Sequence, residues 1–191
     1  MKRIIALCSL ALVMFSCNVG QSLLGAYSLT QCKYDFNSIS NISLGGVNVG
    51  SDNLLGSALA LTSIFTKSSI PLQFTLNLDV KNPGVQTALM NGLQYILEID
   101  GIQMSTGALD SRIQVAPGET GKLPLNLSFD LKKAMSGQSA DAIKNLALNF
   151  VGIGSEPTKV NFQLKPSFDI GGQLMQSPAF IPVSFSFGGK K

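Results

Sequence analysis

Residues 72–107 read LQFTLNLDVKNPGVQTALMNGLQYILEIDGIQMSTG, and this stretch decides the fold. Its first part, 72–81, alternates apolar and polar side chains with a period of two, which places the apolar ones on one face of a β-strand. Asn82-Pro83-Gly84 ends that strand, because proline donates no hydrogen bond and glycine accepts a positive φ. Alternation resumes over 93–99, and Asp100-Gly101 predicts a tight hairpin turn. A sheet with one apolar face needs a second layer, so the stretch predicts a two-layer β domain.

The rest of the chain adds strands and two helices to this unit. Alternation and turn residues predict strands over 29–49, 112–115, 123–131, 160–164, 168–170 and 183–187. Ser51-Asp52 can cap one helix, running to about Phe65, and Ser139 can cap another, running to about Phe150. The fold class expected is therefore mainly β, with two short helical additions.

The order of residues in the central stretch resembles a known family motif. Asn82-Pro83, followed by Leu93, Tyr95, Leu97, Ile99-Asp100-Gly101 and Gly107, resembles the NP...LxYxLxIDGxxxxxG pattern of the group 2 late-embryogenesis-abundant (LEA) proteins, also called the WHy domain. The resemblance implies an immunoglobulin- or fibronectin III-like antiparallel β-sandwich and a part in desiccation or stress protection. It carries over no catalytic residue. The motif residues Asn82, Pro83, Tyr95, Asp100, Gly101 and Gly107 would serve the structure.

The N-terminal residues have the pattern of a lipoprotein signal. Met1-Lys2-Arg3 is basic, and Ile4–Phe15 is an apolar run that is too short to span a bilayer. Met14-Phe15-Ser16-Cys17 resembles the lipobox of bacterial lipoproteins, in the looser form of Bacteroidetes-type signals. If so, Cys17 becomes the acylated N-terminus, and two or three acyl chains hold a protein stably to a membrane. The absence of an aspartate after Cys17 leans toward the outer membrane.

Composition excludes several functions. Apolar residues make up 45% of the chain and charged residues 13%, a composition too hydrophobic and too weakly charged for a disordered protein. Without Lys2 and Arg3 the chain has 12 basic and 11 acidic residues, a net charge of +1, so no nucleic-acid partner is indicated. There is no histidine, which removes histidine-based triads and metal sites. We expect no enzyme activity, no cofactor and no metal.

Other candidate residues have plainer explanations. After processing, Cys32 is the one remaining thiol, expected to be a half-buried small hydrophobe and not a nucleophile. Gly152-Ile153-Gly154 lacks the third glycine of a phosphate loop and is expected to be a simple loop. Tyr27 and Tyr95 are weak candidates for exposed stacking platforms.

These inferences define an organisation and two alternative functions. The segments expected are a signal peptide over 1–16, a lipidated linker over 17–28, the sandwich over 29–187 and a flexible tail over 188–191. The protein would be a non-catalytic lipoprotein of the cell envelope, in the outer membrane and facing the periplasm. Its function would be protection under desiccation or other stress. The alternative is a binding or assembly module that contacts an envelope protein or a glycan.

Overall fold

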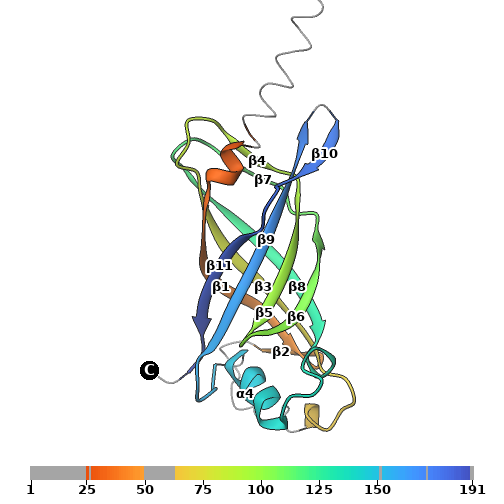
Figure 1. Cartoon of the computed structure of the whole chain (residues 1–191). Helices are drawn as coiled ribbons and strands as arrows, with labels where there is room; N and C mark the ends of the chain where they lie inside the picture. Colours follow the sequence, from red (N-terminus) through yellow and green to blue (C-terminus); the bar gives the residue numbers. More distant parts are fainter. Residues whose placement is uncertain (1–24, 26, 50–62, 151, 171, 190–191) are drawn as a thin grey trace, which may run out of the picture.

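The computed structural model describes residues 25, 27–49, 63–150, 152–170 and 172–189, which form an elongated antiparallel β-sandwich (Figure 1). The fold class predicted from the sequence is confirmed. The elements are β1 (Lys33–Leu44), β2 (Val47–Val49), β3 (Pro71–Lys81), β4 (Ala88–Met90), β5 (Gly92–Ile99), β6 (Ile102–Leu109), β7 (Ile113–Val115), β8 (Thr120–Asp130), α3 (Leu131–Ala134), α4 (Ala140–Phe150), β9 (Thr158–Ile170), β10 (Gln173–Gln176) and β11 (Ile181–Phe187).

The first sheet has the strand order β2-β1-β3-β8. β3 and β8 pair without a register shift from Pro71 opposite Asp130 to Lys81 opposite Thr120. β1 instead carries two β-bulges against β3, one between Phe36 and Ser38 and one between Ser40 and Ser43. Each bulge adds one residue to β1, which turns the following side chains to the other face.

The second sheet has the order β10-β9-β5-β6, with β11 also paired to β9. β9 is the longest strand, and it pairs with β5 along one edge and with β11 and then β10 along the other. Two short strands, β4 and β7, form a separate ribbon at one end of the sandwich (Figure 1).

The core lies between the two sheets, where the alternating apolar side chains predicted from the sequence meet. On β3, Leu72, Leu76 and Leu78 are at most 1% exposed, and Phe162 of β9 is fully buried. Burial of one such side chain contributes about 1.5–3 kcal/mol. Along one side of the sandwich, Phe36 of β1 stacks on Phe185 of β11, with ring centroids 3.9 Å apart.

Helix α4 closes one end of the sandwich (Figure 1). It begins where predicted, because the Ser139 hydroxyl accepts a hydrogen bond of 3.1 Å from the Ala142 amide. At its other end Phe150 contacts the ring of Phe74, 4.9 Å away, and the ring of Phe187, 4.8 Å away. The helix is therefore held by side chains of both sheets.

Several expectations about individual segments were wrong. Residues 29–31, expected in a strand, belong to a helical segment over 27–31, and Leu29 is fully buried there. Residues 160–164 and 168–170 belong to the single strand β9, which continues through Pro166. The strand expected over 123–131 begins earlier, at Thr120, so Pro124 lies inside β8, where its missing N–H is tolerated because β8 is an edge strand. The segment beginning at Leu131 is helix α3.

The signal peptide, Cys17 and most of the helix expected after Ser51-Asp52 lie outside the described residues. Within the part of the chain that the structure describes, no helix is long and apolar enough to cross a bilayer.

Candidate functional site

Asn82, the first residue of the family motif, is fully buried and connects three segments. Its side-chain amide donates hydrogen bonds to the carbonyl oxygens of Gln86 (2.7 Å) and Val115 (3.0 Å), and its side-chain oxygen accepts one from the Gly84 amide (2.9 Å). Its backbone pairs with the turn at Gly118 and Glu119. Asn82 therefore ties the loop after β3 to β7 and to the turn before β8. Pro83, exposed beside it, ends β3 as predicted.

Asp100 and Gly101 form the tip of the β5–β6 hairpin, as predicted. Their φ angles are 50° and 78°, the left-handed values that a type I′ turn requires. The Asp100 carboxylate accepts a hydrogen bond of 2.9 Å from the Lys159 amide, and the Asp100 amide donates one of 2.9 Å to the Lys159 carbonyl. The tip is thus fixed to the start of β9.

Tyr95 is buried, so the expectation that it could be an exposed stacking platform was wrong. Its ring stacks on Phe162, 5.7 Å away, and its hydroxyl lies 3.1 Å from the Ser105 hydroxyl. Its cross-strand partner is Gly107, on which a Cβ would stand 3.3 Å from the tyrosine ring. Tyr27, the other candidate, is 66% exposed.

The six motif residues therefore do not meet in one site. Asn82 and Pro83 lie beside the β4–β7 ribbon, Asp100 and Gly101 lie at the hairpin tip, and Tyr95 and Gly107 lie between them along β5 and β6. Each fixes a turn, a loop or a packed edge.

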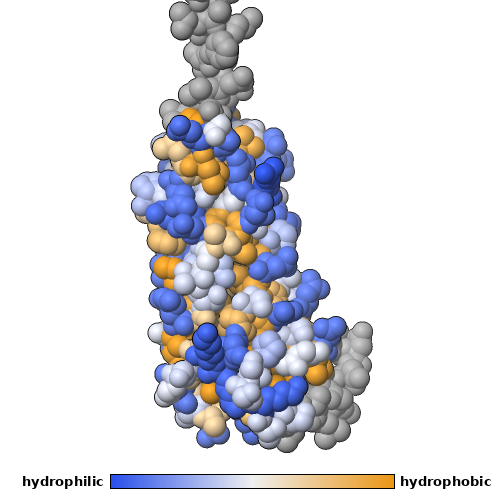
Figure 2. Space-filling model, turned by 90° about the vertical axis from the view of Figure 1, so that its right-hand side faces the viewer, coloured by the Kyte–Doolittle hydropathy of each residue, from blue (hydrophilic) through white to orange (hydrophobic). Residues whose placement is uncertain are grey.

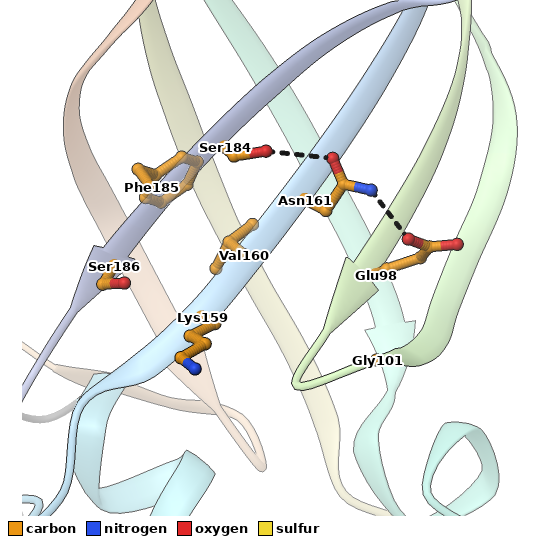
Figure 3. Close-up of a pocket in the computed structure, with 8 residues that line it drawn as sticks. All are labelled: Glu98, Gly101, Lys159, Val160, Asn161, Ser184, Phe185 and Ser186. Atoms are coloured by element: carbon orange, nitrogen blue, oxygen red, sulfur yellow. Dashed lines mark hydrogen bonds between the residues drawn. The ribbon is translucent and has the colours of Figure 1, made fainter.

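A groove of about 430 Å³ lies on the second sheet, is lined by polar side chains together with Val160 and Phe185, and is the best candidate for a surface site (Figure 3). Ser184, Asn161 and Glu98 form a row across β11, β9 and β5. The Asn161 amide donates a hydrogen bond of 2.8 Å to the Glu98 carboxylate and accepts one of 3.2 Å from the Ser184 hydroxyl. Lys159, Ser186 and Gly101 extend the groove toward the hairpin tip (Figure 3).

The chemistry of this groove suits binding. It offers a carboxylate, an ammonium group, an amide and hydroxyl groups, all of which can exchange hydrogen bonds with a polar ligand. No histidine exists in the chain to act as a general base. The groove is open to solvent, and it lies on a flat sheet face instead of in a deep pocket of the kind that small-molecule sites usually form.

A second hollow, of about 610 Å³, lies between α4 and the β5–β6 hairpin tip, and a third, of about 300 Å³, lies on the first sheet beside the second β1 bulge. At that bulge Asn41 has a φ of 52°, and its amide donates a hydrogen bond of 3.2 Å to the Thr75 hydroxyl. Thr75 in turn donates one of 2.8 Å to the Asn126 side-chain oxygen. This row consists of uncharged groups.

Cys32 is buried, and its thiol donates a hydrogen bond of 3.4 Å to the Ser28 carbonyl. Burial raises the pKa of the Cys32 thiol to about 11, which leaves almost no thiolate at neutral pH. No group of three or more acidic or cysteine residues that could hold a metal ion occurs among the described residues.

Asn149 was not identified from the sequence as a structural residue. Its contacts explain why position 154 of the Gly152-Ile153-Gly154 segment is glycine. Its buried amide donates hydrogen bonds of 2.6 Å to the Glu156 carbonyl and the Thr158 hydroxyl, and its oxygen accepts one of 3.2 Å from the Gly189 amide. A Cβ on Gly154 would overlap that oxygen. The glycine is therefore needed for space beside Asn149.

Comparison with known proteins gives distant likenesses only. No family model matches the chain, and no curated protein matches it. A crystal structure of an Archaeoglobus fulgidus protein is similar over 82% of this chain and 99% of its own, with 17% identity and a TM-score of 0.41. The solution structure of an Arabidopsis thaliana protein is similar over 83% of this chain and 80% of its own, with 8% identity and a TM-score of 0.38.

A third solution structure, of a protein provisionally assigned to the late embryogenesis abundant (LEA) class, is similar over 95% of this chain and 84% of its own. Its identity is 12% and its TM-score 0.38. Likenesses this distant carry no argument about function.

Proposed function

We propose that this protein is a non-catalytic lipoprotein of the cell envelope, whose LEA type 2-like sandwich protects the membrane or neighbouring proteins during water loss or related stress. The observation that carries the proposal is that Gly25 lies beside Thr87 and Leu89, at the end of the elongated sandwich where Figure 1 shows β4. Cys17, the proposed acylated residue, precedes it by eight positions. A lipid there would tether one end and leave both sheet faces free.

The buried polar side chains hold the fold together. Every buried side-chain nitrogen and oxygen atom among the described residues has a hydrogen-bond partner. The buried Cys32 thiol is protonated at neutral pH. What remains available for function is the surface.

The outer face of the first sheet supports a protective role. Ser38, Ser40 and Asn77 form hydrogen bonds of 2.9–3.2 Å across β1 and β3, and Asn41, Thr75 and Asn126 continue the uncharged row. Such groups can donate and accept hydrogen bonds in place of water when a neighbouring surface dries.

Anchoring is tested by fractionating cells that express the full-length chain, Cys17→Ala or Cys8→Ala. The wild type and Cys8→Ala, which removes a thiol inside the signal peptide, should sediment with membranes and dissolve only in detergent. Cys17→Ala should lose this behaviour, because it has no cysteine to carry the acyl chains that hold the protein to the membrane. Membrane retention of Cys17→Ala would contradict the proposed anchor.

Protection is tested by drying a sensitive enzyme with the protein, or with an equal mass of an inert globular protein, and measuring activity after rehydration. The proposal predicts greater recovery with this protein. Equal recovery in the two samples counts against a protective role.

The groove at Glu98, Asn161 and Ser184 favours a second candidate, a binding or assembly module of the envelope. This is tested by crosslinking the tagged chain in its native cells and comparing Asn161→Ala with Asn126→Ala, a matched change on the other sheet. A near-stoichiometric partner that is lost only in Asn161→Ala supports binding at the groove. Equal capture by both variants removes the groove from consideration.

A further inference from the structure

Exposed apolar side chains gather at the end of the sandwich where Gly25 lies. The described residues include seven large hydrophobic side chains classed as exposed, and five belong to segments at this end. They are Tyr27 (66% exposed), Val85 (86%), Leu89 (39%), Leu174 (66%) and Met175 (49%). We name these five residues the apolar end.

The apolar end is built from three segments. Gly25 packs against the β4 region, since a Cβ on it would stand 3.3 Å from the Thr87 carbonyl oxygen and 3.5 Å from Leu89. Val85 lies in the loop that Asn82 organises, just before β4. Leu174 and Met175 lie on β10, which Figure 1 places at the same end as β4 and β7.

These side chains are costly to leave in water. Scattered exposed hydrophobics are ordinary, but several that share one end make that end a candidate for contact with an apolar partner. Figure 2 shows apolar residues near this end beside hydrophilic ones. Charges of both signs accompany them, including Lys81, Arg112 and Asp169, so the contact would not depend on a charged partner.

The proposed lipid anchor would place the apolar end close to the membrane. Eight residues of extended chain span at most about 28 Å, so an acylated Cys17 keeps Gly25 within that distance of the bilayer. Strand β9, with 13 residues, is about 40 Å long. The tether is thus shorter than the sandwich, and it is attached to the end that carries the exposed apolar side chains.

We propose that Tyr27, Val85, Leu89, Leu174 and Met175 rest on the lipid surface of the membrane, so that the sandwich stands on this end with α4 pointing away. The proposal rests on the proposed anchoring through Cys17. Apolar and aromatic side chains at the boundary of headgroups and acyl chains add to an acyl anchor and fix its orientation. The two sheet faces and the groove at Glu98, Asn161 and Ser184 then remain open above the membrane.

The chain contains no tryptophan, so a single introduced tryptophan reports its own surroundings. The full-length lipidated protein is prepared as Val85→Trp, Leu174→Trp or Ile153→Trp and placed in phosphatidylethanolamine–phosphatidylglycerol vesicles with and without brominated lipid. Ile153 is the matched control, because it is also an exposed hydrophobic, 41% exposed, and follows α4 at the opposite end.

We expect blue-shifted emission and quenching by brominated lipid for Val85→Trp and Leu174→Trp, and neither for Ile153→Trp. Raising the salt concentration should change this little, because the contact is apolar. Equal, weak quenching at all three positions in vesicle-bound protein would overturn the docking while leaving the Cys17 anchor intact. A blue shift in native membranes without quenching in lipid vesicles would assign the end to a protein and also overturn it.

Failure of the anchor gives a different result. If the protein carries no lipid and does not sediment with vesicles, the proposed function fails first, before any tryptophan signal is read. The three positions are exposed, so the substitutions should leave the fold intact, which circular dichroism checks.

Discussion

Tyr95 occupies the space that a side chain on Gly107 would need. The two residues are direct cross-strand partners on β5 and β6, and a Cβ on Gly107 would stand 3.3 Å from Cε1 and 3.4 Å from the hydroxyl oxygen of Tyr95. The absence of a side chain lets the tyrosine ring lie over the edge strand and reach the Ser105 hydroxyl. This contact gives a physical reason for the spacing of tyrosine and glycine in the motif.

We therefore expect Gly107→Val to lower the free energy of unfolding by about 1–3 kcal/mol, because the added side chain crowds the Tyr95 ring and disturbs its stack on Phe162. Urea denaturation measures the loss. Ala108→Val, on the exposed neighbouring position, should change the value by less than about 0.5 kcal/mol. Equal losses in the two variants would show that space beside Tyr95 is not limiting.

Gly101 is needed for a different reason, its backbone conformation. A Cβ there would meet nothing within 4 Å, but its φ is 78°. Gly101→Ala should cost about 1–2 kcal/mol from the left-handed strain alone. Gly101→Asn should cost less, because asparagine tolerates this conformation better. The explanation fails if alanine and asparagine destabilise the protein equally.

Asn82→Ala should be among the more damaging single changes, at about 2–3 kcal/mol, because it leaves the Gln86 and Val115 carbonyls without their donor. Asn82→Asp has the same shape but cannot donate to either carbonyl, so it should cost at least as much. Asn48→Ala, on exposed β2, is the control and should be nearly neutral. A small loss of stability in Asn82→Asp would mean that the shape of the side chain, and not its hydrogen bonding, matters at position 82.

The burial of the Cys32 thiol leads us to expect that the free energy of unfolding falls at alkaline pH. Its thiol titrates near 8.5 in an unfolded chain, and burial raises its pKa to about 11 in the folded protein. The stabilisation is thus complete below about pH 8.5 and is lost as the pH rises toward 11. Burial also raises the pKa of Tyr34, which adds to the decline. Cys32→Ala should flatten the curve between these values, measured by urea denaturation across the pH series.

Much of the fold follows from periodicity and turn chemistry. Strand β3, the hairpin at Asp100-Gly101 and the cap at Ser139 were all predictable, because each depends on neighbours in sequence. The face on which each apolar side chain of β1 lies could be predicted only in part. Tyr34 and Phe36 share a parity that Ile39 breaks, because the first bulge lies between Phe36 and Ser38, and that bulge depends on pairing with β3.

Features set by contacts between distant segments were not predictable. The burial of Tyr95 depends on Phe162 and Gly107, and the role of Asn149 depends on the loop to Thr158 and the glycines at the C-terminal end. The groove at Glu98, Asn161 and Ser184 joins three strands whose order only the folded sheet supplies. The one signal in the sequence for Asn149 was its position three residues after Leu146, on the predicted inward face of the helix.

The most direct test of the account is the intact mass of the protein extracted in detergent from its native membranes. We predict a chain that begins at Cys17 and carries the added mass of a diacylglycerol group and an N-acyl chain, with the Cys32 thiol unmodified. A chain that retains residues 1–16, or one with a free thiol at Cys17, would contradict the proposed anchor and with it the docking of the apolar end.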